Sequence, residues 1–152
     1  MENLWPTKAD IFFSEEGSPK KILEEQVNLF NQEFNEIRAE ILSESSFSEI
    51  DLSNLQIHTS SNSIKNSAYM NMGAPIYHRL IISSVLGNYR IEILRIKQYP
   101  SNNYPSEIID CINDNNHIVN TKEELNSVLK TIFHSDRVKT TLRNILKLYK
   151  GI

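Results

Sequence analysis

The stretch that decides the fold is Ile76–Tyr99, which reads IYHRLIISSVLGNYRIEILRIKQY. Two runs rich in β-branched and aromatic residues flank the pair Gly87-Asn88, a pattern typical of a β-hairpin. From Tyr89 to Ile93, apolar and charged side chains alternate, so one face of this strand is expected to be buried. Leu94 then continues the apolar pattern on the opposite parity. This change predicts a bulge, or a second covered face, near Ile93-Leu94.

An amphipathic helix is predicted on the N-terminal side of the hairpin. Ser18 provides an N-cap. Pro19 suits the first helical position, because the N–H group at that position makes no intrahelical hydrogen bond and its absence costs nothing. Apolar residues follow at alternating spacings of four and three, which defines a single buried stripe. The stripe extends the predicted helix to about Leu42 or Ser43, and it consists of Leu23, Val27, Phe30, Phe34, Ile37 and Ile41.

Two more helices are predicted near the C-terminus. Asn120 or Thr121 caps the first, and acidic residues in the first turn complete the start signal. Ser135-Asp136 separates it from the last helix, after which Gly151 is expected as the C-cap. The buried stripes are predicted to be Leu125, Val128, Leu129, Ile132 and Phe133 in the first helix, and Val138, Leu142, Ile145, Leu146 and Tyr149 in the second.

A short strand is expected at residues 107–112, and residues 50–57 and 63–72 are candidate strands, with a loop at 100–105 and a turn at 113–117. Together with the hairpin, they predict an antiparallel sheet of about four strands. The order of helix, strands and helices favours an α+β fold over alternating βαβ units. We expect a single α+β domain over residues 1–152, in which residues 1–17 form an N-terminal arm.

The composition is that of a folded protein and favours a cytoplasmic location. Of the 152 residues, 39% are hydrophobic and 23% charged, which is ordinary for a globular domain. Cys111 is the single cysteine, so no intramolecular disulfide is expected. The first residues lack the pattern of a signal peptide, and no apolar run approaches the length of a membrane span.

The familiar catalytic and metal-binding motifs are missing from the sequence. It contains no Gly-rich phosphate loop, dinucleotide fingerprint, nucleophile elbow or zinc-ligand spacing. The Asn- and Asp-rich stretch near His117 lacks the Gly and the final Glu of a calcium loop, so we interpret it as a turn. Cys111 and His117 are the nearest pair to a nucleophile and base, but we expect Cys111 to be a small buried residue in a strand. We therefore expect no catalytic residue, metal or cofactor.

The charge of the chain is uneven. Residues 1–75 contain 5 Lys and Arg against 12 Asp and Glu, whereas residues 76–152 contain 11 against 7. An acidic surface could bind a basic partner, and an exposed Trp would mark such a surface. The candidate partner-binding residues are Trp5, Glu25, Glu36 and Glu40. The last helix has a basic row that could follow a phosphate backbone, which consists of Lys139, Arg143, Lys147 and Lys150.

Several short segments occur in an order that resembles a set of small uncharacterised bacterial proteins. They are Leu4-Trp5-Pro6, residues 19–26 (PKKILEEQ), residues 88–94 (NYRIEIL), Tyr104-Pro105, and residues 123–136, which begin EEL and end LKTIFHSD. The resemblance spans most of the chain. It implies an α+β architecture and brings no activity or catalytic residue with it.

These observations favour a non-enzymatic, protein-binding module, such as an immunity or inhibitor protein, or an accessory component of a toxin or phage-defence system. The alternatives are a nucleic-acid-binding accessory protein that uses the basic row, and an enzyme with an unrecognised site near Cys111 and His117. A protein partner is expected, nucleic acid is the less favoured partner, and no membrane association is expected. The sequence leaves a homo-oligomer open.

Overall fold

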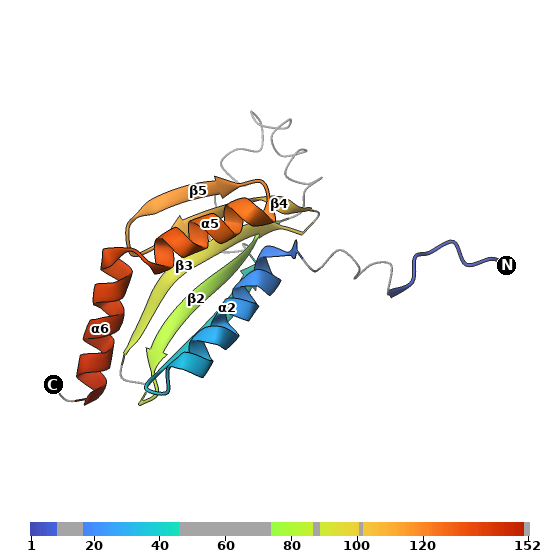
Figure 1. Cartoon of the computed structure of the whole chain (residues 1–152). Coiled ribbons are helices and arrows are strands. Elements are labelled where there is room, and N and C mark those ends of the chain that lie inside the picture. The colour runs from blue at the N-terminus through green and yellow to red at the C-terminus, as the bar shows by residue number, and fades with distance from the viewer. Residues whose placement is uncertain (9–16, 46–73, 87–88, 101, 151–152) are drawn as a thin grey trace, which may run out of the picture.

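The computed structural model describes residues 1–8, 17–45, 74–86, 89–100 and 102–150. Its elements are α2 (Pro19–Glu33), β1 (Ile37–Ser45), β2 (Ile76–Ser84), β3 (Arg90–Tyr99), β4 (Asn102–Asp110), β5 (Asn115–Val119), α5 (Lys122–Phe133) and α6 (Asp136–Lys150). The chain is α+β, with one N-terminal and two C-terminal helices around an antiparallel sheet, as predicted (Figure 1). The sheet has five strands rather than about four.

Each strand of the sheet pairs with the next one in the chain, in the order β1-β2-β3-β4-β5. The predicted hairpin is confirmed as β2 and β3, which pair antiparallel in the interior of the sheet. The N–H of Ser84 donates to the carbonyl of Tyr89 at 2.9 Å, so the connection is longer than a two-residue turn. Gly87-Asn88 lies outside the described residues, as do the candidate strands at 50–57 and 63–72 and the C-cap expected at Gly151.

The predicted bulge is also confirmed. Leu80 faces Leu94 across the β2–β3 ladder, whereas Ile81 faces Glu92, so Ile93 is the extra residue in β3. The insertion lets two consecutive side chains be buried, because Ile93 is 2% exposed and Leu94 is fully buried. The change of parity in the sequence therefore reports a real change in strand geometry.

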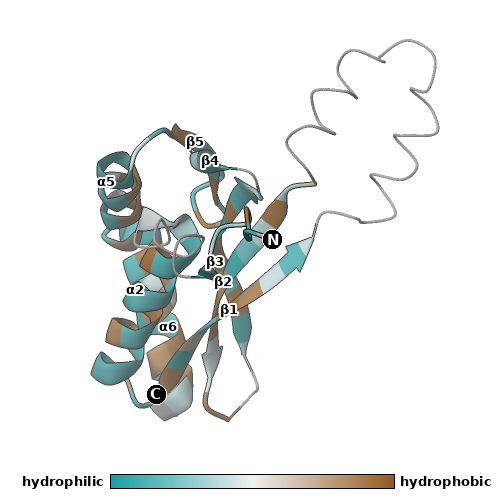
Figure 2. Cartoon of the chain, turned by 90° about the vertical axis from the view of Figure 1, so that its right-hand side faces the viewer, coloured by the Kyte–Doolittle hydropathy of each residue, from teal (hydrophilic) through white to brown (hydrophobic). Residues whose placement is uncertain are grey.

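All three described helices lie on one face of the sheet (Figure 2). Strand alternation directs the apolar residues of the inner strands toward these helices, and side chains from both layers form one core. Its fully buried members include Leu23 of α2, Leu94, Ile96 and Ile108 of the sheet, and Leu125 of α5. None of the described helices has the length and apolar character needed to cross a membrane.

The predicted first helix is too long. It ends at Glu33, and residues expected to continue it form the edge strand β1. Phe34 adopts an extended conformation at φ −113° and ψ 130°. Ile37 and Ile41 are four residues apart, as a helix stripe requires, but they also share the face of a strand. Antiparallel pairing with β2 decides between these two periods, and it buries Ile37 and Ala39.

Two boundaries around β4 also differ from the prediction. The expected loop at 100–105 gives way to a strand from Asn102, and the ladder between β3 and β4 shifts register between Lys97 and Tyr99. Such an irregularity accommodates Pro105, which has no N–H for a ladder. The strand ends at Asp110 instead of Ile112, because the Asp110 carboxylate accepts the N–H groups of Ile112 and Asn113 in a turn.

The predicted caps are confirmed. Ser18 Oγ accepts the N–H of Lys21 at 3.2 Å, with Pro19 as the first helical residue. Thr121 Oγ1 accepts the N–H of Glu124, whose carboxylate accepts the N–H of Asn120, which closes a reciprocal cap at the start of α5.

Candidate functional site

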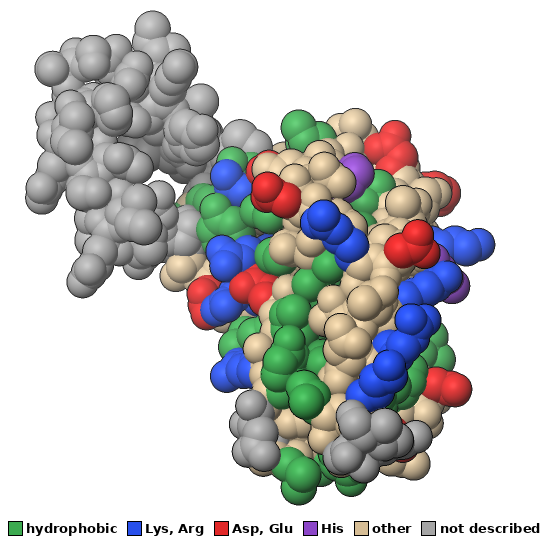
Figure 3. Space-filling model, turned by 90° about the vertical axis from the view of Figure 1, so that its left-hand side faces the viewer, with side chains coloured by type: hydrophobic (Ala, Val, Ile, Leu, Met, Phe, Trp, Pro, Cys, Tyr) green, Lys and Arg blue, Asp and Glu red, His purple; other side chains and the backbone are tan. Residues whose placement is uncertain are grey.

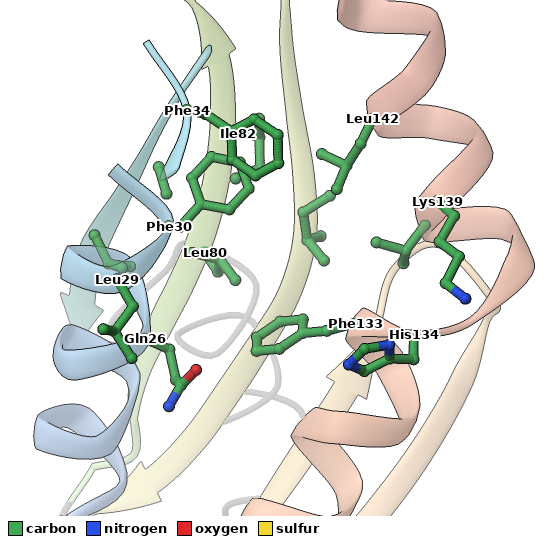
Figure 4. A pocket seen from close by; sticks show the side chains of 14 residues that line it. Gln26, Leu29, Phe30, Phe34, Leu80, Ile82, Phe133, His134, Lys139 and Leu142 are labelled. Atoms are coloured by element: carbon green, nitrogen blue, oxygen red, sulfur yellow. The ribbon is translucent and has the colours of Figure 1, made fainter. Parts of the chain in front are cut away.

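A groove lies over the sheet between α2 on one side and the α5–α6 pair on the other (Figure 4). The cavity in this groove has a volume of about 450 Å³. Its floor is entirely aliphatic and consists of Ala39, Leu80, Ile82 and Ile93. These residues come from β1, β2 and β3, so the bulge at Ile93 contributes directly to the floor.

The first wall of the groove belongs to α2. Phe30 and Phe34 point into the groove with ring centroids 4.6 Å apart (Figure 4). Leu29 also lines the cavity, yet its side chain remains 56% exposed. On α2, Asn31 uses its side-chain amide to bond the free edge of β1, with Ala39 N–H donating at 2.8 Å and Ala39 carbonyl accepting at 3.0 Å. This pair of hydrogen bonds holds the α2 wall against the edge of the sheet.

The opposite wall belongs to the end of α5 and the start of α6. Phe133 extends toward α2, and Val138 and Leu142 of α6 complete the apolar surface. Ser135 Oγ accepts the N–H of Val138 at 3.3 Å, as a helix cap does, and confirms the predicted restart of the helix. The same Oγ accepts the side-chain N–H of Asn113 at 3.1 Å, so the β4–β5 turn fixes where α6 begins.

Polar side chains occur only at the margins of the groove. Gln26 and His134 lie at one end, and Phe34 and Leu142 lie toward the other (Figure 4). Lys139 contributes the single charged side chain to the lining. A concave, mostly apolar site with a few polar groups at its edge is the general form of a binding pocket.

The two walls have rims of opposite charge. On α6, Lys139, Arg143 and Lys147 follow at intervals of four residues and are exposed, and Figure 3 shows Lys and Arg side chains in a line along this helix. On α2, Glu25 and Glu33 lie one turn before and one turn after Leu29, and both are exposed. Within the described part of the chain, neither row forms an ion pair with another side chain.

The predicted partner-binding residues are not brought together on one surface. Trp5 is 82% exposed, and its backbone N–H donates to Asn3 Oδ1 within the same short segment. Glu25 lies on α2, whereas Glu36 lies in the connection to β1, where its carbonyl accepts the N–H of Val85. Glu40 belongs to the opposite face of the sheet and pairs with Arg90 at 3.2 Å. The early end of α2 explains this separation.

The basic row predicted for the last helix is a feature of α6. Lys139, Arg143 and Lys147 are exposed, and Lys150 ends the helix. The sequence pattern thus identified one rim of the groove, although it did not indicate the groove itself.

The face of the sheet opposite the described helices carries a network of ion pairs rather than a charged patch of one sign. Arg79 pairs with Glu44 at 2.9 Å and with Glu92 at 3.0 Å, and Arg95 also pairs with Glu92. Burial raises the pKa of Glu92, but the hydrogen bonds from Arg95 and Arg79 outweigh it and lower that pKa below its usual value. The hydrogen bonds that Arg79 donates to Glu92 and Glu44 raise the pKa of Arg79. The charges on this face mainly satisfy one another.

Cys111 and His117 do not form a nucleophile and base pair. The expectation that Cys111 is buried is wrong, because it is exposed in the turn after β4, where its Sγ contacts the Ile109 carbonyl at 3.8 Å. Partial burial of the sulfur and the nearby Glu92 raise the pKa of the thiol, which disfavours the reactive thiolate. His117 pairs with Ile108, so its side chain lies on the face of the sheet that the helices cover. Glu92, the neighbour of Cys111, lies on the other face. The sheet thus separates the two side chains.

The Asx-rich stretch does form a turn, but at residues 111–114, because the residues from Asn115 to His117 that were expected in the turn belong to β5. Asp110 is 2% exposed, and its carboxylate accepts three hydrogen bonds from Ile112 and Asn113. Asp114 adopts a positive φ of 57°, a conformation that Asp tolerates better than most residues. Among the described residues, no group of three or more His, Cys, Asp or Glu side chains is arranged to hold a metal ion.

Sequence reasoning missed the groove because its floor and walls have the pattern of core residues. Phe30, Phe133 and Leu142 all belong to predicted buried stripes, and nothing local shows that these stripes face a gap. One signal was available. Leu29 is a large apolar residue outside the stripe of α2, and it marks the direction in which the buried surface continues beyond the core.

No protein-family model, curated protein or solved structure matches this chain. The groove and its two charged rims therefore carry the functional argument.

Proposed function

We propose that this protein is a non-enzymatic, protein-binding module, and that the groove between α2 and the α5–α6 pair binds an apolar segment of its partner. A groove of this shape suits an amphipathic helix, whose apolar side chains would enter between the two walls. Immunity or inhibitor proteins and accessory components of toxin or phage-defence systems are the modules we have in mind, and we place the protein in the cytoplasm.

The observation that supports this proposal most directly is the uncovered apolar groove itself. The floor residues are themselves only 2–4% exposed, so the accessible apolar surface lies on the walls, where Leu29 is 56% exposed and the other large side chains are only partly buried. Leaving these side chains accessible to water costs stability, which a binding partner would recover when it covers them. The α2 wall runs from Gln26 to Phe34, which lies just past the end of the helix, and so spans about 12 Å or roughly two turns. Two turns of an amphipathic helix present apolar residues at positions i, i+3, i+4 and i+7, which is a common spacing of anchors in a groove.

A displayed library of helical peptides, about 14 residues long with randomised surface positions, tests this proposal. We expect panning against the intact protein to enrich apolar residues at i, i+3 or i+4, and i+7. The Leu29→Glu variant places a charge at the groove and should weaken the selected peptides at least tenfold. Leu148→Glu is the matched control, because Leu148 is also on an exposed helix surface, at 65% exposure, but does not line the groove.

The proposal fails if panning yields no binder that distinguishes these two variants. It also fails if a fatty acid such as palmitate occupies the groove and no peptide displaces it. Circular dichroism of both variants keeps the comparison valid by verifying that each retains the helix and strand content of the parent protein.

The basic row on α6 favours nucleic-acid binding as a second candidate function. Three exposed cations on consecutive turns could follow a phosphate backbone, whose contacts weaken steeply with salt. Binding of a single-stranded or duplex DNA probe that falls with added NaCl and with Arg143→Glu would support it. Binding that is absent at low salt would eliminate it.

A further inference from the structure

We infer that the partner helix has one acidic flank and one basic flank, and that the charged rims of the groove set the direction in which this helix lies. This inference rests on the proposed function. The structure provides two observations for this inference. One rim is basic and the other acidic, and they border opposite walls of the same groove. A helix that lies in this groove therefore meets charges of opposite sign on its two sides.

The basic rim is placed by the residues of the wall. Lys139 lines the groove, and Arg143 and Lys147 continue from it at intervals of four residues along α6. The acidic rim is placed in the same way, because Leu29 lines the groove and Glu25 and Glu33 lie four residues to either side of it on α2.

Both rims are free to pair with a partner. The described part of the chain offers these five side chains no ion pair, in contrast to Arg79, Arg90 and Arg95 on the opposite face of the sheet. A fatty acid or an anionic lipid would find only the α6 rim favourable, since the α2 rim repels its head group. A protein segment can match both rims at once, so the observations favour a mixed-charge helix.

Direction follows from geometry. A helix with its apolar stripe in the groove and acidic residues on one flank can place them against α6 in only one direction. When the acidic and basic flanks are exchanged, the same contacts require the helix to be reversed end to end. The groove has distinguishable ends, with His134 and Gln26 at one and Phe34 at the other (Figure 4).

The experiment uses synthetic 15-residue peptides that share one leucine stripe and differ only in their flanks. One has Glu on one flank and Lys on the other, a second has both flanks basic, and a third has both acidic. At low ionic strength we expect the mixed peptide to bind the intact protein about tenfold more tightly than the other two, since each exposed ion pair shifts affinity by up to about fivefold. The difference should disappear at about 0.5 M NaCl.

Charge reversal on the protein provides the decisive comparison. Lys139→Glu with Arg143→Glu makes both rims acidic, so the peptide with two basic flanks should become the tightest binder. Arg38→Glu with Lys122→Glu is the matched control, because it changes the net charge equally at residues that do not line the groove. We expect this control to leave the order of the three peptides unchanged.

A nitroxide spin label at the N-terminus of the peptide reports the direction in which the bound peptide lies in the groove. In two-dimensional NMR spectra of the protein, we expect broadening near one end of the groove for the mixed peptide and near the other end when its flanks are exchanged. Peptides that bind the groove with equal affinity and in both directions would overturn this inference while the binding function stands. Peptides that produce no shifts at the groove at any flank charge would overturn the binding function as well.

Discussion

The carboxylate of Asp110 offers the sharpest test of how the groove is positioned. It is 2% exposed and accepts three hydrogen bonds, from the N–H of Ile112 at 3.1 Å, the N–H of Asn113 at 3.0 Å and the side-chain amide of Asn113 at 2.8 Å. That amide also donates to Ser135 at the start of α6. Asp110→Ala would therefore remove the hydrogen bonds that hold the turn and those that position Asn113, which connects the turn to the groove wall.

The size of the effect follows from these contacts. A hydrogen bond to a charged acceptor contributes about 1.5 kcal/mol or more, and donors that lose their partner away from water add a penalty. The three bonds share one carboxylate, so their effects do not add in full. We expect Asp110→Ala to lower the free energy of unfolding by about 3 kcal/mol, a large fraction of the stability of a domain. The midpoint of thermal unfolding should fall by roughly 6–12 °C.

Urea unfolding followed by circular dichroism measures this change at pH 7. Asp110→Asn retains an acceptor oxygen and should lose only about 1 kcal/mol. Asp114→Asn is the control in the same turn, because its side chain is exposed and Asn tolerates the same positive φ. A loss below about 1 kcal/mol in Asp110→Ala, or an equal loss in Asp114→Asn, would refute the reasoning.

Two further predictions concern the interior and the edge of the sheet. His78 is 4% exposed, and burial lowers its pKa, so the folded state favours the neutral imidazole. The contribution of His78 to stability should therefore be complete above pH 6.5 and should decrease below it. The free energy of unfolding should fall by at most about 1.4 kcal/mol per pH unit. Urea titrations from pH 7.5 to 5.0 should show this fall and its reduction in His78→Gln, and an unchanged slope would contradict it. Asn31→Ala removes both bonds to Ala39 and should cost about 1–2 kcal/mol, whereas Asn28→Ala on the exposed face of α2 should be neutral within about 0.5 kcal/mol. Equal unfolding midpoints for these two variants would show that the edge contact contributes nothing.

Elements whose signals are local were predictable from the sequence. The caps at Ser18 and Thr121 depend on residues within one helical turn, and both were identified. The β2–β3 hairpin could be predicted from its two apolar runs, and the bulge at Ile93 from the change of parity in the apolar alternation at that residue. In each case the interaction that determines the structure lies within a few residues of the pattern that announces it.

The end of α2 was not predictable in the same way. Ile37 and Ile41 satisfy the periods of both a helix and a strand, and the choice between them is made by pairing with residues 76–84. Asn31 adds a second distant contact, because its amide bonds the edge of the new strand. Neither contact has a signature near Ile37 in the sequence. Because the helix ends at Glu33, the candidate partner-binding residues Glu25, Glu36 and Glu40 lie on different elements.

The groove depends on the direction in which α6 leaves α5, which is a tertiary property. Ser135 caps α6 while Asn113 of the β4–β5 turn holds that cap, so a residue 22 positions away fixes the wall. A small change in this angle would close the gap and bury Leu142, as Val138 already is. The sequence specifies apolar side chains equally well in both cases, so their pattern alone does not reveal a binding site.

The basic row acquires a clearer explanation from the same geometry. Cations are favoured near the C-terminal end of a helix, where they interact with its dipole, and this accounts for Lys147. It does not account for Lys139, which lies close to the N-terminal end of α6, where the dipole disfavours a positive charge. Lys139 is the member of the row that lines the groove. A cation in an unfavourable position on its own helix, at the margin of an apolar cavity and opposite an acidic rim, is better explained by what the groove binds than by the stability of α6.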